Sequence, residues 1–212
     1  MPAIKKESFD TYFGTAAEKA AFASMALGDK YFETDTGKTF VYSGAAWVTD
    51  AEDVNSNSGK SSCSTTRPDD ATPYAVNDVV GTADANMTFA DILANAGQQF
   101  IVTGVTLETD AAAIPAGMGN FKLHLYDANP TVIADNAAYN LPAGDRAKYL
   151  GCIPIAMPVD LGDTLWSQND NLNFNGKLAA GSTSLFGILT TDNVYTPSNL
   201  AVKEITLYTL GV

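Results

Sequence analysis

The feature that most constrains the fold is a series of short apolar or alternating runs between residues 73 and 212, each ended by turn-forming residues. Runs of this length are typical of β-strands. The clearest is 121–126, in which Phe121, Leu123 and Leu125 face one side and the residues between them face the other. The predicted strands are 75–80, 99–107, 121–126, 149–155, 164–167, 184–190 and 200–210. This pattern predicts a mainly β domain, an antiparallel β-sandwich that is jelly-roll-like.

A second, smaller module is predicted before this domain. Thr15 and Glu18 have the spacing of a capping box, and they precede an Ala-rich stretch with Phe22, Met25 and Ala26 on one helical face. This predicts a helix over 16–26 that ends at Gly28. Two apolar runs, 31–34 and 39–42, flank a turn at Gly37, and a third short strand is expected at 46–48.

Aromatic side chains are concentrated in this small module. A hairpin of this size is marginally stable in water and does not bury so many aromatic rings alone. An interface role is therefore the hypothesis for Phe32, Phe40, Tyr42 and Trp47. Trp166, at a strand edge near polar residues, is a further candidate, either for an interface or for a sugar-binding platform.

Residues 50–72 are small and polar and have no apolar periodicity, which is typical of a linker. The expected organisation is an anchoring module at 1–49, a linker at 50–72 and a β-sandwich domain at 73–212. Asn86 to Ala96 fits either a short helix or an extended stretch.

Charge excludes one class of function. The formal net charge is −12, and the only pair of adjacent cations is Lys5–Lys6, so the cationic surface that nucleic-acid binding needs is absent. No apolar run approaches the roughly 20 residues that cross a bilayer, and no membrane partner is expected. The N-terminus lacks the apolar segment of a signal peptide, which predicts folding in a cytoplasm. Cys63 and Cys152 are expected to be free thiols, the first exposed and the second buried.

Catalytic and metal-binding patterns are weak. His124 is the only histidine, so it is the only candidate for the base of a serine or cysteine nucleophile, and no Gly-x-Ser-x-Gly motif accompanies it. Asp127 and Asp135 flank a loop that could hold Ca²⁺, although turn capping explains Asp127 more simply. Asp160 and Asp163 bracket another turn. The expectation is a chain with no catalytic residues, no metal and no cofactor.

Two parts of the chain resemble virion proteins of tailed bacteriophages. The segment 28–48, GDKYFETDTGKTFVYSGAAWV, resembles a hairpin motif of virion and tail-associated chains. Blocks of the C-terminal part, among them FKLHLYDANPTVIADNAAY, YLGCIPI and SLFGILTTDNVYTP, resemble a domain of phage virion proteins. The resemblance implies a structural role and no catalytic residue.

The resulting expectation is a capsid decoration, or cement, protein that binds the outer surface of the head and stabilises the shell. Its expected partners are the major capsid protein or other virion proteins and further copies of itself, as a homotrimer. Its expected location is the virion, assembled in the host cytoplasm. The alternative is a tail or head-fibre component that binds a host receptor or glycan, and the third possibility is a glycan-degrading enzyme.

Overall fold

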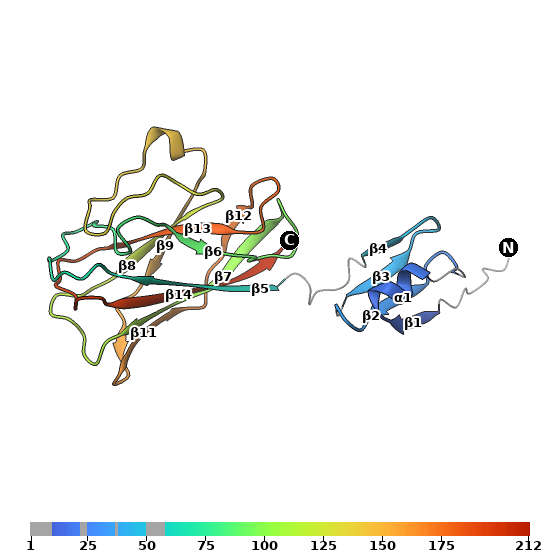
Figure 1. The fold of residues 1–212 in the computed structure, drawn as a ribbon, viewed down its shortest axis with the longest axis horizontal. Helices are drawn as coiled ribbons and strands as arrows, with labels where there is room; N and C mark the ends of the chain where they lie inside the picture. Colours follow the sequence, from blue (N-terminus) through green and yellow to red (C-terminus); the bar gives the residue numbers. More distant parts are fainter. Residues whose placement is uncertain (1–9, 22–24, 37, 50–57) are drawn as a thin grey trace. The chain divides into compact units, whose positions relative to one another are not determined.

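The computed structural model describes residues 10–21, 25–36, 38–49 and 58–212. The chain divides into two compact units, Met1–Ser56 and Asn57–Val212 (Figure 1). Phe22, Gly37 and the first part of the predicted linker lie outside the described residues.

The first unit is a four-stranded sheet with one short helix. Its elements are β1 (Thr11–Gly14), α1 (Ala16–Ala21), β2 (Lys30–Glu33), β3 (Thr39–Tyr42) and β4 (Trp47–Thr49). The strand order is β1-β2-β3-β4, in which β1 pairs parallel to β2 and the other pairs are antiparallel. The predicted hairpin and third strand are therefore confirmed, and β1 is an additional strand.

The capping box at the start of α1 is also confirmed. The backbone N–H of Thr15 donates to Glu18 Oε2 at 2.7 Å, and the backbone N–H of Glu18 donates to Thr15 Oγ1 at 3.3 Å. The bond from the Thr15 N–H, together with one from Thr15 Oγ1 to the same carboxylate oxygen at 3.0 Å, holds the pKa of the Glu18 carboxyl below its usual range. The described helix ends at Ala21, and Met25 and Ala26 are not helical, so the predicted extension to residue 26 is wrong at its end.

The second unit is a β-sandwich of two antiparallel sheets. One sheet has the order β10-β11-β7-β14-β5, with β12 also paired to β7, and the other has the order β6-β13-β8-β9. The strands are β5 (Ser58–Thr66), β6 (Met87–Phe89), β7 (Gln99–Asp110), β8 (Phe121–Tyr126), β9 (Tyr149–Ile155), β10 (Val159–Asp160), β11 (Thr164–Asn169), β12 (Phe174–Lys177), β13 (Leu185–Thr191) and β14 (Val202–Gly211). A 3₁₀ turn, η2, spans Ala143–Asp145.

The pairing of these strands is that of a jelly roll. The chain forms nested antiparallel pairs from the outside inward: β5 with β14, β6 with β13, β7 with β12, and β8 with β9. Members of successive pairs alternate between the two sheets, so one long hairpin is wound around a common core. The predicted fold class is confirmed.

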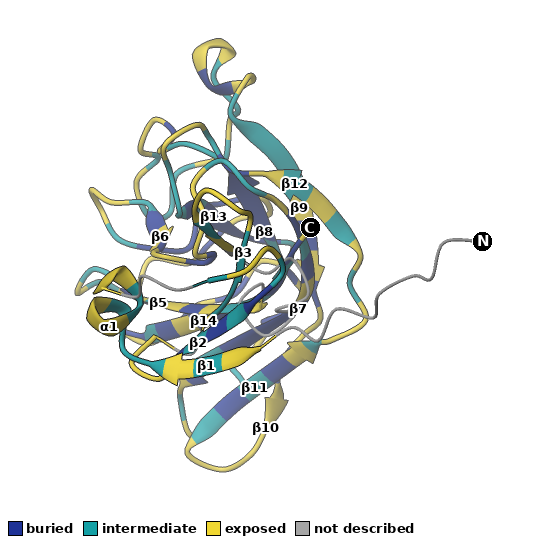
Figure 2. Ribbon diagram, turned by 90° about the vertical axis from the view of Figure 1, so that its right-hand side faces the viewer, coloured by how far each residue is buried: buried dark blue, intermediate teal, exposed yellow. Residues whose placement is uncertain are grey.

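The core lies between the two sheets. Figure 2 shows buried residues running along β7, β8 and β13. Phe121, Leu123 and Leu125 are all fully buried, as the alternation of this strand predicts. The opposite face of β8 is also covered, because Tyr126 and Ile188 pack against Tyr139 and Tyr149 in a second, smaller cluster.

The predicted linker is wrong beyond residue 57. Residues 58–66 form β5, which pairs along its whole length with β14 at the edge of the larger sheet. The inward positions of β5 hold only small side chains, such as Ser61 and Thr65, so the strand has no apolar alternation. Gly59 is required there because a Cβ would overlap the backbone carbonyl of Ile92.

Two smaller predictions are corrected, and the alternatives left open at 86–96 are decided against a helix. Residues 75–80 make isolated bridges and no strand, and the ambiguous stretch 86–96 contains β6 followed by turns. The two cysteines are free, but their exposure is the reverse of the prediction: Cys63 is half-buried and Cys152 is exposed. The reason is that Ile153 and Ile155 occupy the inward positions of β9, which leaves Cys152 on the outward side.

Candidate functional site

The two faces of the N-terminal sheet differ. Residues paired in register project from the same side of a sheet. Tyr31 pairs with Phe40, and Tyr42 with Trp47, so these four aromatic residues share one face. Lys19 of α1 covers this face: its Nζ lies 3.0 Å from the centroid of the Phe40 ring and 2.6 Å from Glu33 Oε1.

The covered face is packed as a small core. The rings of Tyr31 and Trp47 are 5.6 Å apart between centroids, those of Tyr42 and Trp47 5.4 Å, both in edge-on geometry. Tyr31 is almost fully buried, and its hydroxyl donates to the carbonyl of Thr15 at the start of α1. Trp47 Nε1 is buried and has no hydrogen-bond partner among the described residues. These rings therefore stabilise the unit itself.

The opposite face of this sheet carries four apolar side chains beside the polar residues Thr11, Lys30 and Thr39, and two of the apolar side chains are exposed. Phe13 pairs with Phe32, and Val41 pairs with Val48, so the four side chains project from the side away from α1. We call them the open apolar face. Phe13 is 71% exposed and Val48 47% exposed, while Phe32 and Val41 are half-buried. The rings of Phe13 and Phe32 are in contact, with centroids 6.1 Å apart.

The interface residues predicted from sequence are therefore divided between the faces. Phe32 belongs to the open apolar face, whereas Phe40, Tyr42 and Trp47 lie on the covered one. Phe13 and Val48 were missed. The signal that could have identified them is the period-2 alternation of 11–14 and 47–49 once these segments are assigned as strands.

Trp166 lies in the other unit, on the outer face of the larger jelly-roll sheet. It pairs with Glu108, which in turn pairs with Glu204, so the three side chains form a row across β11, β7 and β14. Trp166 is half-buried there. A shallow hollow of about 170 Å³ beside the row is lined by Glu108, Asp110 and Glu204.

His124 lies in a closed environment that does not suit a catalytic base. Its ring stacks on Tyr139 with centroids 3.9 Å apart, Nδ1 lies 3.2 Å from the Tyr149 hydroxyl and Nε2 lies 3.2 Å from Thr190 Oγ1. Both ring nitrogens are thus engaged. Burial, with a smaller contribution from Lys122, lowers the pKa of His124 to about 4. Cys152 is its cross-strand neighbour, yet neither nitrogen is free to activate that thiol.

His124 predicts a loss of stability in mild acid. Its pKa is lower in the folded chain than the usual value near 6.5, so the unfolded chain binds more protons between about pH 4 and 6.5. Neutral His124 contributes about 2–4 kcal/mol to the free energy of unfolding. This contribution is complete above the window and is lost as the pH falls through it. Urea unfolding from pH 7 to pH 4 measures it. As the pH falls, the free energy of unfolding of wild type should decrease relative to that of His124→Phe. A difference that does not change with pH would contradict the lowered pKa of His124.

The acidic candidates for a metal site do not converge. No group of three or more histidine, cysteine or acidic residues suited to a metal occurs in the part of the chain that the structure describes. Asp135 is used internally, since Tyr74 and Gly81 donate to its Oδ1 at 2.6 and 2.9 Å. Asp160 accepts a bond from the backbone N–H of Gly162 and so caps its turn.

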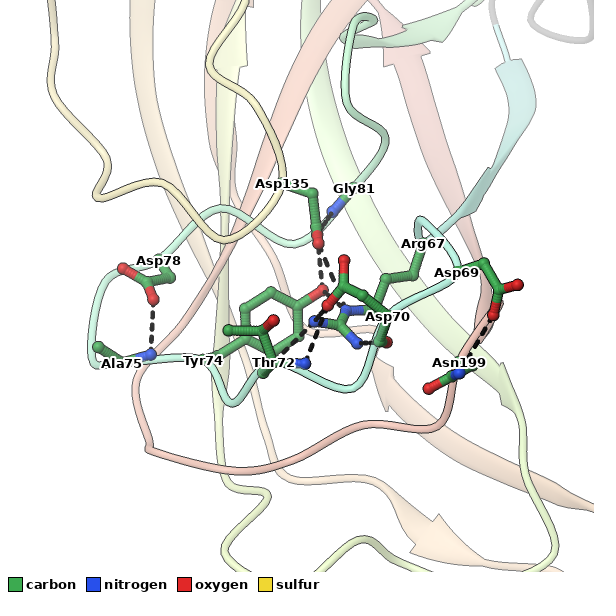
Figure 3. Close-up of polar contacts among 10 residues, drawn as sticks. All are labelled: Arg67, Asp69, Asp70, Thr72, Tyr74, Ala75, Asp78, Gly81, Asp135 and Asn199. Carbon is green, nitrogen blue, oxygen red and sulfur yellow. Dashed lines mark hydrogen bonds and ion pairs between the residues drawn. The ribbon is translucent and has the colours of Figure 1, made fainter.

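The most polar buried site is centred on Arg67, directly after β5 (Figure 3). Arg67 Nε donates to the hydroxyl of Tyr74 at 3.0 Å and lies 3.3 Å from Asp135 Oδ2. Its terminal nitrogens donate to Asp70 and to the carbonyl of Thr72. The side chains of Arg67 and Asp135 are 1% and 2% exposed, so this is a buried ion pair. We call Arg67, Tyr74, Asp135 and Tyr195, whose ring lies 5.2 Å from that of Tyr74 between centroids, the Arg67 cluster.

Comparisons with known proteins give weak matches. No protein-family model matches the chain, and no curated protein matches it. Among solved structures, it is similar to a chain of the native virion of Kashmir bee virus at acidic pH, with 14% identity over 90% of this chain and 91% of that chain, at a TM-score of 0.28. It is also similar to a chain of the sacbrood virus of honeybee, with 9% identity over 76% and 68%, at a TM-score of 0.24. Scores this low do not define a common fold, so the jelly-roll assignment rests on strand order alone.

Within the described ranges, no helix is both long enough and apolar enough to cross a bilayer.

Proposed function

We propose that the chain is a non-catalytic structural protein of a tailed-phage particle, which binds the outer surface of the head and stabilises the shell. The observation that carries the proposal is the open apolar face on a unit separate from the jelly roll. The jelly roll supports it, because capsid domains commonly use this fold, as does the resemblance of residues 28–48 to phage virion chains. A fold alone does not define a function, and the exposed side chains of the open apolar face are what a partner would contact.

The proposed partner of the open apolar face is the major capsid protein or another virion protein. Phe13 and Val48 are exposed on a small sheet whose opposite face is already filled by aromatic rings and α1. Burying such side chains contributes about 25 cal/mol per Å² of apolar area, less the cost of ordering. Many copies around one shell, and a trimeric arrangement of the chain, would strengthen modest contacts through multivalency.

The test uses the full chain and heads that lack it. Phe13→Ser combined with Val48→Ser should weaken binding by about 10- to 100-fold, because two exposed contacts of about 1 kcal/mol each are lost. The matched control is Val159→Ser combined with Leu161→Ser, which removes exposed apolar side chains from the jelly-roll unit. Sedimentation with heads measures binding, and light scattering reports whether the free protein is a trimer. Equal binding by the two double variants would contradict the proposal.

A second candidate function is a tail or head-fibre component that binds a glycan or host receptor. The observation that favours it is the row of Trp166, Glu108 and Glu204 on the outer face of the larger sheet, since an aromatic ring beside hydrogen-bonding side chains suits a sugar. Binding of the purified chain to a glycan array, abolished by Trp166→Ala, would favour this function. The number of copies of this chain in purified particles distinguishes the two functions. Decoration requires a number comparable to that of the major shell protein, whereas a tail or fibre component is present in far fewer copies.

A further inference from the structure

The outer face of the larger jelly-roll sheet carries two aromatic rings at separate positions. Trp166 on β11 projects from this face beside Glu108, and Tyr208 on β14 projects from it beside Gly104. Both aromatic side chains are half-buried, so part of each remains accessible. Tyr208 is four residues along β14 from Glu204, which is level with Trp166, and β14 lies two strands from β11, so the two Cα atoms are roughly 16 Å apart. A single ligand that contacts both rings must therefore be extended.

The Tyr208 ring lies against the backbone of β7. A Cβ at Gly104 would be 3.6 Å from Tyr208 Cδ2, so a larger side chain there would displace the ring. On the other side, Lys60 Nζ lies 5.6 Å from the ring centroid, and a cation–π contact at such an exposed site is weak enough for a ligand to replace it. Packing against the sheet fixes the ring in advance, which lowers the cost of ordering it when a ligand binds.

A row of small polar side chains lies between the levels of the two rings. Gln168 pairs with Thr106, Thr106 with Thr206, and Thr206 with Ser62, so the row crosses four strands. Ser62 Oγ and Thr206 Oγ1 are 2.7 Å apart and form a hydrogen bond. The two threonines are buried, whereas Gln168 and Ser62 are exposed. Hydroxyl and amide groups both donate and accept hydrogen bonds, so this row suits a ligand with many hydroxyl groups.

Two carboxylates border this row. Glu108 and Glu204 lie directly opposite each other on β7 and β14, and like charges in this arrangement destabilise a sheet. The fold itself therefore gains nothing from the pair. Carboxylates accept strong hydrogen bonds from hydroxyl groups and repel anions. We call the whole surface the outer polar face, and its residues are Trp166, Glu108, Glu204, Gln168, Thr106, Thr206, Ser62 and Tyr208.

The residue types of the outer polar face favour a sugar over a protein partner. The centre of a protein–protein interface is depleted in glutamate and serine, whereas here carboxylates and hydroxyl groups lie between the rings. A sugar ring offers an apolar C–H face to an aromatic side chain and hydroxyl groups around its edge. We infer that the outer polar face binds a neutral polysaccharide, whose sugar rings stack on Trp166 and Tyr208 and whose hydroxyl groups bind the side chains between them. This inference rests on the second candidate function and does not depend on the open apolar face.

Affinity electrophoresis of the full chain, in native gels that each contain one polysaccharide, tests the inference. Dextran, mannan and galactan are the neutral probes, and polygalacturonate and hyaluronate are the acidic ones. At least one neutral probe should retard wild type, and Trp166→Ala and Tyr208→Ala should each lower the affinity for it by about tenfold. Trp166→Phe and Tyr208→Phe, which keep a ring, should lose less. No retardation by any neutral probe, or equal retardation by an acidic one, would overturn the inference.

Further variants separate this inference from the two candidate functions. Phe13→Ser combined with Val48→Ser should bind the neutral probe as wild type does, and Trp166→Ala should bind heads as wild type does. Retardation by acidic probes alone, lost in Trp166→Ala, would keep the glycan-binding candidate and overturn the neutral ligand. Loss of head binding in Trp166→Ala, with no polysaccharide bound by wild type, would identify the outer polar face as a protein-binding surface and overturn the inference.

Discussion

Replacement of Arg67 by methionine is expected to lower the free energy of unfolding of the jelly-roll unit by about 3–5 kcal/mol. The substitution leaves the Asp135 carboxylate buried with only the Tyr74 hydroxyl and the Gly81 N–H as donors. It also frees the carbonyl of Thr72 and the carboxylate of Asp70. Losing one member of a buried ion pair costs more than the pair contributes, because the remaining charge is unpaired. Urea unfolding at pH 7, followed through Trp166, measures the loss.

Two further variants separate the ion pair from general disruption of this segment. Arg67→Met combined with Asp135→Leu removes both charges and should be less destabilised than the sum of the single variants. Asp69→Ala, which loses one exposed hydrogen bond to Asn199, should change stability by no more than about 0.5 kcal/mol. A loss below about 1 kcal/mol for Arg67→Met would show that solvent reaches Asp135 and compensates its charge.

The strands that could be predicted from sequence are those whose side chains alternate or whose buried run is continuous. β8 and β9 begin and end at the predicted residues, and β13 is displaced by one residue from the predicted 184–190. These strands lie in one sheet of the sandwich and bury large apolar side chains. Their buried positions can therefore be identified from the order of apolar residues in the sequence.

β5 could not be predicted in this way. It is an edge strand, and its inward positions are filled by Ser61, Cys63 and Thr65, which leave no apolar period. Its place is determined by β14, a strand more than a hundred residues later in the chain, so the information lies in tertiary pairing. The Arg67 cluster was missed for the same reason. Arg67 follows this strand in a polar run, and Asp135 approaches it only when the jelly roll closes.

In the N-terminal unit, the sequence does not indicate which face of the sheet each aromatic ring occupies. The sequence correctly indicated too many aromatic rings for a bare hairpin, but it did not indicate which rings face α1. Register settles this question: Phe40, Tyr42 and Trp47 fall on the side of Tyr31, and Phe32 on the other. A single residue of offset exchanges the two faces, so the open surface can be identified only after the strands are paired.

Truncation of Phe121 to alanine is expected to lower the free energy of unfolding by about 3–5 kcal/mol, through lost transfer energy and the cavity left in the core. Phe121 is fully buried at the start of β8, and its ring packs edge-on against Tyr195 with centroids 6.1 Å apart. Side chains of both sheets surround Phe121, so the neighbouring residues can move little to fill the cavity. Thermal and urea unfolding of the full chain, followed by circular dichroism, measure the loss.

The neighbouring residue, Lys122, gives the matched control for the inward orientation of Phe121 on β8. Lys122→Ala removes an ion pair of 2.7 Å to Asp192, in which both side chains are partly exposed, and should cost no more than about 1 kcal/mol. The large ratio between adjacent positions is the signature of a strand whose inward side chains form the sandwich core. Similar losses for Phe121→Ala and Lys122→Ala would contradict the placement of β8 between the sheets, and with it the jelly-roll pairing of β8 with β9 and β13.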